Sequence, residues 1–462
     1  MTKIPNLLGA AALYVAAAFA PPALAAAQAV QEKTLANGLR VIAVEDRRAP
    51  VAVHMVWYRV GAMDESDGVS GVAHVLEHMM FKGTRSLGPG EFSERVSAAG
   101  GRDNAFTSLD YTAYFQLVPV RRLGEMMAIE ADRMANLKID PKEFASELKV
   151  VMEERRLRTE DQPQARVHEA LMSAAYQAHP YRRPIIGWMN DLENMTAEDA
   201  REWYRRWYVP NNAYLVVVGD VDSREVFRLA EKTYGRIPKR ALPRRKPPAE
   251  PVQNGPRRVT VKAPAKLPYI AMGYKVPVLR DVERDREPYA LEVLAGVLDG
   301  HDAARLSKNL VRGRKLAVSA GAGYESSVRG ESLFVLDGSP GEGHGVDELQ
   351  AALREEIERI RREGVPEDEL RRVKTQAIAS QIYRRDSMMA QAMEIGRTEA
   401  AGHSWRDIDR MIEKIRSVSA EEVQEVARKY LNDDGLTIAV LDPQPLPAAK
   451  RPAAAPAAHA GR

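Results

Sequence analysis

The chain has 462 residues, of which 45% are hydrophobic and 28% charged, and its formal net charge is +3. This composition is typical of a globular protein of two or more domains, and it excludes the strong charge bias of proteins that bind nucleic acids or anionic membrane surfaces. There is no cysteine, so disulfides and a lipid-modified N-terminal cysteine are excluded.

The first 29 residues have the pattern of a secretory signal peptide. Lys3 provides a short positive region, residues 7–20 are apolar, and two prolines follow at 21–22. Small-x-small cleavage signals end at Ala25 and at Ala29, and the sequence does not choose between them. The apolar stretch is too short and wrongly flanked for a membrane span, so we expect export without stable membrane insertion, an uncleaved anchor being the alternative. Export without cysteine fits the bacterial periplasm best.

The next part of the chain alternates irregularly between strand and helix patterns. We expect a strand pair at 41–44 and 52–58, helices at 72–80, 90–97, 122–134 and 141–159, and one long strand at 105–118. This order favours an α+β sandwich, in which a mixed or antiparallel sheet has helices packed on one side.

The two halves of the chain resemble each other. Thr196 and Asp199 form a capping-box pattern that opens a helix, and an apolar strand follows. The same order returns at Ser419 and Glu422, about 223 residues later. We therefore predict two homologous sandwich domains.

Prolines and charges between 238 and 256 predict an extended, solvated linker between the domains. The predicted organisation is a signal peptide at 1–29, an N-terminal domain at 30–240, a linker at 241–257, a homologous C-terminal domain at 258–442 and a disordered tail rich in Ala and Pro at 443–462.

Two histidines and a glutamate lie within five residues of an apolar helix pattern. On a helix, residues i, i+3 and i+4 share one face, so His74, Glu77 and His78 point the same way. This is the H-x-x-E-H pattern of inverted zincins, in which the histidines bind zinc and the glutamate activates a water. The alternative is a polar helix face with two ordinary histidines. The apolar residues 79–81 disfavour it, because a buried pair of imidazoles needs partners.

A zinc site also needs a third protein ligand. Glu147 and Glu154 are seven residues apart, two helical turns, so they share a face, and Val150 and Val151 indicate that this face is inward. Inward carboxylates are costly unless they are paired or bind a metal. Taken alone, however, these residues fit a solvated charged face that includes Arg155 better than a metal site.

These stretches resemble the pitrilysin/insulinase metallopeptidases, and their small bacterial members in particular, over nearly the whole mature chain. The similarity lies in residues 74–84, 100–112, 147–154 and 179–187. The resemblance implies that His74, His78 and Glu154 bind one Zn²⁺ per chain and that Glu77 is the catalytic general base. It also implies that Glu147 orients a ligand imidazole by accepting its free N–H.

The resemblance further implies a substrate-binding strand. Asn104, Ala105 and Phe106 match the sheet edge on which the family holds its substrate as an added β-strand. Because this mode reads the peptide backbone more than the side chains, it suits loosely specific cleavage of extended peptides.

One part of the family pattern is missing from the second half. Members with a complete site usually have an Arg and, seven residues later, a Tyr, which stabilise the peptide carbonyl opposite the zinc. The aligned positions hold Val311 and Val318. Arg312, Arg314 and Tyr324 could replace the missing pair, but their positions in the alignment with the family motif disfavour this. We therefore expect a paralogous subunit without the zinc motif to supply the pair, with a homodimer as the alternative.

The sequence thus predicts a periplasmic zinc endopeptidase for extended peptides or small unfolded proteins. A non-catalytic peptide-binding or scaffold subunit of the same fold is the rival hypothesis, and a zinc hydrolase of small amides is a third that the substrate strand disfavours. The other histidines show no ligand spacing and are expected on the surface or hydrogen-bonded in the core; they are His54, His168, His179, His301, His344, His403 and His459.

Overall fold

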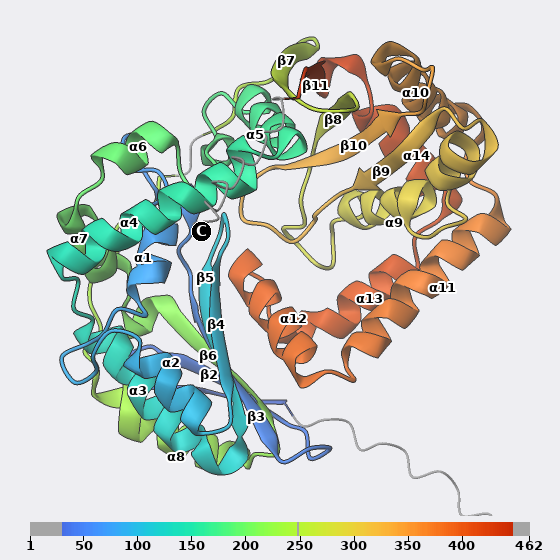
Figure 1. Ribbon diagram of the computed structural model, residues 1–462. Coiled ribbons are helices and arrows are strands. Elements are labelled where there is room, and N and C mark those ends of the chain that lie inside the picture. The colour runs from blue at the N-terminus through green and yellow to red at the C-terminus, as the bar shows by residue number, and fades with distance from the viewer. Residues whose placement is uncertain (1–29, 247–248, 447–462) are drawn as a thin grey trace, which may run out of the picture.

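The computed structural model describes residues 30–246 and 249–446 (Figure 1). The predicted signal peptide and residues 447–462 of the predicted tail lie outside the described residues. Two sheets, one in each half of the chain, lie side by side, and each carries its own helices (Figure 1). Within the described part of the chain, every helix is too short or too polar to cross a membrane.

The first sheet has six strands in the order β1-β2-β6-β3-β5-β4. The strands are β1 (Val30–Thr34), β2 (Arg40–Glu45), β3 (Val51–Tyr58), β4 (Arg102–Thr107), β5 (Thr112–Pro119) and β6 (Ala213–Gly219). β2 and β6 are parallel and all other neighbours antiparallel, so the sheet is mixed, as predicted.

Two predictions about this sheet were wrong. The strands expected to pair at 41–44 and 52–58 are β2 and β3, and β6 lies between them, because the parallel partner comes from far along the chain. The single strand expected at 105–118 is the hairpin of β4 and β5. Its turn at 108–111 is closed by a 2.8 Å hydrogen bond from Ser108 N to Tyr111 O and contains no Gly or Pro to signal it.

Helices cover one face of the first sheet and enclose the main core of this half. They are α1 (Val72–Met79), α2 (Glu91–Ala98), α3 (Leu123–Asn136), α4 (Pro141–Arg155), α6 (Met189–Asn194), α7 (Ala197–Trp207) and α8 (Ser223–Thr233). A π-helical turn, Arg156–Glu160, ends the helix expected at 141–159 and leads into α5 (Pro163–Ala175). Residues from α1, α3, α4 and α7 pack together against the sheet in this core.

The second half repeats this arrangement. Its sheet has the order β7-β11-β8-β10-β9, with β7 and β11 parallel. The strands are β7 (Arg257–Pro264), β8 (Tyr269–Val276), β9 (Ala317–Gly323), β10 (Ser332–Pro340) and β11 (Leu436–Gln444), and the helices are α9 (Glu287–Asp299), α10 (Val346–Glu363), α11 (Glu367–Arg384), α12 (Met388–Ala401), α13 (Ile408–Arg416) and α14 (Ala420–Tyr430). Both predicted capping boxes, at Thr196 and Ser419, are present. β11 includes the first two residues of the predicted tail.

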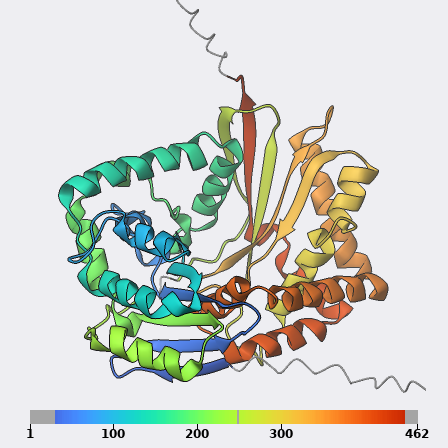
Figure 2. The same ribbon diagram turned by 60° about the horizontal axis from the view of Figure 1, so that its bottom comes forward.

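The two halves also exchange one helix each. α5 packs on β7, β8 and β11 of the second sheet, and α12 packs on β3 and β6 of the first (Figure 2). On α12, a Cβ added at Gly396 would lie 2.1 Å from the ring of Trp57, and Glu399 accepts two hydrogen bonds from Arg40. This layer was not predicted, because the buried face of α12 is mostly small and polar and gives no amphipathic signal.

The described residues between 238 and 256 contain no helix or strand and are mostly exposed, as predicted, but some of their side chains bind the two halves. The side chain of Glu250 is 1% exposed and accepts the backbone N–H groups of Gln177, Ala178 and His179 as well as Lys275 Nζ at 2.8 Å. Arg245 donates to Asp64 at 2.7 Å. The linker is therefore fixed against both halves.

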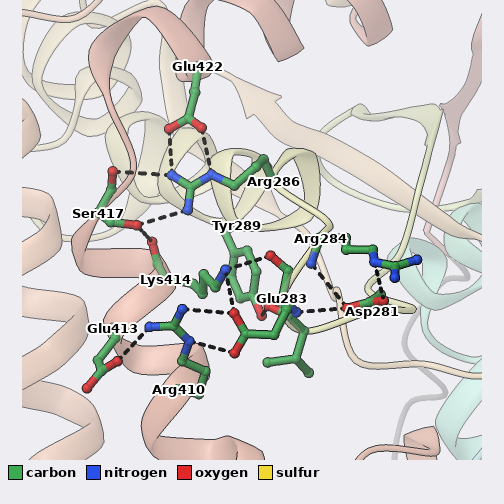
Figure 3. Close-up of polar contacts among 11 residues, drawn as sticks. Asp281, Glu283, Arg284, Arg286, Tyr289, Arg410, Glu413, Lys414, Ser417 and Glu422 are labelled. Atoms are coloured by element: carbon green, nitrogen blue, oxygen red, sulfur yellow. Dashed lines mark hydrogen bonds and ion pairs between the residues drawn. The ribbon is translucent and has the colours of Figure 1, made fainter.

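An ionic network joins three helices of the second half (Figure 3). Glu283, in the turn before α9, accepts two hydrogen bonds from Arg410 of α13, at 2.7 and 2.8 Å, and pairs with Lys414 at 3.0 Å. These bonds hold the pKa of Glu283 down to about 2. Arg286 makes a similar double contact with Glu422 of α14. Because the network is largely solvent-exposed, we assign it a structural role of modest energy.

We predict that Glu250→Gln lowers the free energy of unfolding near neutral pH and that the difference from wild type becomes smaller as the pH falls. Burial opposes the charge, but the hydrogen bonds from Lys275 and the backbone lower the pKa of Glu250 from 4.5 to about 2. Its carboxylate therefore stabilises the folded state above pH 4.5, and this contribution is lost as the pH falls towards 2. The variant should lose about 1–3 kcal/mol of unfolding free energy at pH 7, measured by urea titration.

The exposed Glu342→Gln change is the matched control and should have no measurable effect. A difference between wild type and Glu250→Gln that stays constant from neutral pH down to about pH 3 would contradict the assignment.

Candidate metal centre

Helix α1 carries the H-x-x-E-H motif, and groups outside the helix hold its N-terminus. The N-cap residue Gly71 has φ 88° and offers no side chain. Instead the carboxylate of Glu65 accepts the N–H groups of Gly71 at 2.8 Å and Ala73 at 2.9 Å. A Cβ added at Gly187 would lie 2.3 Å from Ser70 O, so the two backbones touch where the helix begins. The segment that ends at Gly187 thus sets the position of α1.

Three side chains from α1 and α4 converge beside the helix. One ligand atom each of His74, His78 and Glu154 lies within 4.8 Å of the others. Glu154 Oε2 is 3.3 Å from His78 Nε2 and 3.9 Å from His74 Nε2. Ligands about 2.0–2.2 Å from a tetrahedral zinc ion are roughly 3.3–3.6 Å from one another. The set therefore fits zinc with small adjustments.

The electrostatics of the two imidazoles differ. Burial, with smaller effects from His78 and Arg158, lowers the pKa of His74 to about 3, so its ring stays neutral, which is the form that binds a metal. Burial opposes the charged form of His78 as well, but the hydrogen bond to Glu147 and the charges of Glu154 and Glu77 outweigh it and raise the pKa of His78.

Glu147 lies behind the imidazole of His78. Its Oε1 atom is 2.9 Å from His78 Nδ1 and its Oε2 atom is 2.6 Å from Lys82 Nζ. Because a carboxylate can only accept, the Nδ1–H of His78 donates to it and Nε2 is left for a metal. Lys82 lies within the stretch 74–84, but no local pattern connects it with Glu147.

The inner face of α4 is narrower than predicted. Phe144, Glu147 and Val151 are buried, whereas Val150 is 50% exposed. The prediction that Val150 lies on the inward face was therefore wrong. The buried stripe of α4 runs through Glu147 and Val151. Val150 lies about 100° around the helix from Val151 and faces solvent.

Glu77 lies between the two histidines and strand β4. Thr107 Oγ1 donates a hydrogen bond to Glu77 Oε2, and burial raises the pKa of Glu77 above its usual value. A carboxylate with a raised pKa is better suited to accept a proton near neutral pH. Thr107 belongs to the stretch 100–112, but its sequence position does not indicate a hydrogen bond to Glu77.

A cavity of about 730 Å³ opens in front of these groups. Its walls come from α1, β4, the end of α4, α5 and residues 181–186. Asn104, Ala105 and Phe106 line it, on a strand that, within the described ranges of the chain, pairs only with β5 and leaves its other edge open. The N–H of Ala105 donates to its neighbour Asn104 Oδ1 at 2.8 Å.

Among the described residues, none from the second half lines this cavity. Val318 is 54% exposed on β9, the edge strand of the other sheet, and Val311 packs on the second core. Two of the alternatives are engaged elsewhere, since Tyr324 donates to Pro277 O at 2.5 Å and Arg314 pairs with Glu355 at 2.8 Å.

Comparisons with known proteins agree with this geometry. Residues 40–188 match the family model described as Insulinase (Peptidase family M16), and residues 194–377 match Peptidase M16 inactive domain. Over 343 residues the chain is 34% identical to a Helicobacter pylori protein named Zinc protease PqqE, covering 73% of this chain and 76% of that protein. The chain belongs to the pitrilysin/insulinase family, M16.

Solved structures of M16 proteins share its two-domain architecture. The crystal structure of a protease from Helicobacter pylori has a TM-score of 0.84 at 30% identity and covers 90% of this chain and 100% of that one. The periplasmic protease PqqL from Escherichia coli has a TM-score of 0.77 at 21% identity, over 90% of this chain and 48% of that one, and shows the same fold. A Bacillus subtilis relative, Uncharacterized zinc protease YmxG, is 26% identical over 90% of this chain and 98% of its own length.

We predict that Gly187→Ala disturbs the entry to α1. The added methyl would meet backbone atoms of Ser70 and Gly71 within 3 Å, at a residue whose φ is +86°. We expect a loss of about 2–4 kcal/mol of unfolding free energy, together with weaker metal binding, measured by denaturant titration and metal analysis.

Gly343→Ala is a matched control, because Gly343 has φ +82° and no heavy atom within 4 Å of an added Cβ. It should cost only the roughly 1–2 kcal/mol of the backbone conformation. Equal losses in the two variants would show that the close approach at Gly187 does not matter.

Proposed function

We propose that this chain is a zinc-dependent endopeptidase that cleaves extended peptides or small unfolded proteins in the bacterial periplasm. The observation that carries the proposal is the convergence of His74, His78 and Glu154 beside Glu77, on a cavity bordered by an open strand edge. The names of the relatives, zinc proteases in several bacteria, support it.

In this proposal His74, His78 and Glu154 hold one zinc ion, and Glu147 keeps the ring of His78 oriented. Zinc supplies Lewis-acid polarisation of the scissile carbonyl and lowers the pKa of a bound water towards about 7. Glu77 takes the proton of the attacking water and passes it to the nitrogen of the leaving amine. Because Thr107 occupies Glu77 Oε2, the other oxygen is left for this proton transfer.

The substrate adds to the open edge of β4 as an extended strand. The backbone of Ala105, whose N–H points away from β5, would pair with the peptide, with Asn104 and Phe106 on either side of it, so that Asn104 Oδ1 gives up its bond to the N–H of Ala105. Recognition through the main chain makes sequence specificity weak and favours unfolded substrates.

A partner completes the site in this proposal. Val311 and Val318 stand where the family usually has the Arg and Tyr that stabilise the carbonyl oxygen, and losing such a donor costs about 10²–10³ in rate. A paralogous subunit without the zinc motif supplies the pair, and a homodimer is the alternative. The same two valines favour the second candidate function, a non-catalytic peptide-binding subunit. The signal-peptide pattern at 1–29 supports the periplasmic location.

We predict that Glu77→Gln loses peptidase activity but keeps zinc, whereas Glu154→Gln loses the zinc ion itself. Glu77→Gln keeps the ligand set, so the variant should bind one zinc ion per chain and lose at least about a thousandfold in peptidase activity. Glu154→Gln removes a ligand and should lose the metal itself. Elemental analysis and cleavage of labelled casein measure the two effects.

The control is Glu153→Gln, an exposed neighbour paired with Arg156, which should change neither zinc content nor peptidase activity. Undiminished cleavage by Glu77→Gln would overturn the proposal.

We predict that the purified chain binds zinc but cleaves casein slowly on its own. Adding the paralogous subunit should raise the rate by about a hundredfold or more, because it supplies the missing carbonyl donors. If the chain works as a homodimer, its specific activity should instead rise with its own concentration. Full activity that is independent of concentration and of any partner would refute both versions.

A further inference from the structure

His168 lies at the boundary between the zinc cavity and the second half of the molecule. It is an exposed residue of α5 and lines the cavity together with Leu109 and Met172. The adjoining face of α5 packs on the second sheet through Val167 and Leu171, and Figure 1 shows α5 beside that sheet. A side chain at this position can therefore contact both the cavity and the second sheet.

One residue of the second sheet, Tyr269, contacts the ring of His168, and Asp337 in turn holds Tyr269. His168 Nε2 is 3.0 Å from the hydroxyl oxygen of Tyr269 on β8, and that hydroxyl donates to Asp337 Oδ2 on β10 at 2.7 Å. Tyr269 is buried, with its ring centroid 5.9 Å from that of His168. Burial and the charge of Asp337 raise the pKa of Tyr269 well above its usual value, so the hydroxyl keeps its proton.

This order of donors determines the tautomer of His168. The single hydroxyl proton of Tyr269 goes to Asp337, so the hydroxyl oxygen accepts, and His168 Nε2 must carry the hydrogen that it accepts. In the neutral ring Nδ1 is then an acceptor. Nδ1 has no hydrogen-bond partner within residues 30–246 and 249–446, and it belongs to a residue that lines the cavity.

We propose that His168 binds the peptide substrate at the α5 end of the zinc cavity, where Nδ1 accepts a backbone N–H, and that Tyr269 and Asp337 orient its ring. The inference rests on the proposed peptidase function. It makes His168 a substrate-binding residue, and Tyr269 and Asp337 positioning residues that act through it. The second half of the chain then contributes to substrate binding without touching the zinc ligands.

The test measures peptide affinity in the zinc-loaded Glu77→Gln background, by fluorescence anisotropy of a fluorescein-labelled β-casein fragment of about 20 residues. His168→Ala should weaken binding by about five- to tenfold, the effect of one hydrogen bond. Tyr269→Phe should weaken it by about three- to tenfold. The double variant should bind no more weakly than His168→Ala alone, because Tyr269 acts only through His168.

Two further substitutions distinguish the role of Nδ1 from that of Nε2. The oxygen of Asn can stand near the place of Nδ1, whereas the amide of Gln reproduces only Nε2. His168→Asn should therefore retain more affinity than His168→Gln. The control Tyr324→Phe removes a hydroxyl that bonds to Pro277 O away from the cavity, and it should leave affinity unchanged.

Unchanged peptide affinity in His168→Ala overturns the proposal. Tighter peptide binding by His168→Gln than by His168→Asn also overturns it. Additive losses in the double variant overturn the positioning role of Tyr269. If the Glu77→Gln parent binds no zinc or no peptide, it is the proposed function that fails, and this outcome is distinct from the others because it precedes any change at His168.

Discussion

The contact between α1 and α4 is the constraint on which the site depends. α1 brings two imidazoles and Glu77 on one face, and α4 brings two carboxylates two turns apart, one on each side of the ring of His78. Neither helix alone can bind a metal or satisfy its own buried polar groups. The position of α1 is set at its N-terminal end by the carboxylate of Glu65 and by the close approach of Gly71 and Gly187.

The same helical segment that supplies Glu154 also joins the two halves. α4 passes through the π-helical turn at Arg156–Glu160 into α5, and α5 packs on strands β7, β8 and β11 of the second sheet. Arg155 binds Glu169 through two hydrogen bonds across this turn, at 2.9 and 3.0 Å. A metal ligand, a wall of the cavity and the domain contact therefore belong to one continuous stretch, so the second half supports the site even though none of its described side chains lines the cavity.

The sequence predicted what local spacing encodes and missed what distant segments decide. The shared helix face of His74 and His78, the repeated halves and the mixed sheets could be predicted, because motif spacing and capping patterns are local. The convergence of Glu154 with the two histidines was implied by the family resemblance and not by its own spacing. The insertion of β6 between β2 and β3 and the exchange of α5 and α12 could not, because both depend on contacts far along the chain. The same holds for the tethering of the linker by Glu250, an acid that looked solvated among prolines.

The proposed function requires two imidazoles and one carboxylate to bind a single zinc ion. X-ray absorption at the zinc edge of the reconstituted chain measures this ligand set. We expect a shell of nitrogen and oxygen ligands at about 2.0–2.1 Å with the outer-shell signature of two imidazoles, and a change in that shell in Glu154→Gln. A shell with six oxygen ligands and no imidazole signature, or a spectrum that Glu154→Gln leaves unaltered, would contradict it.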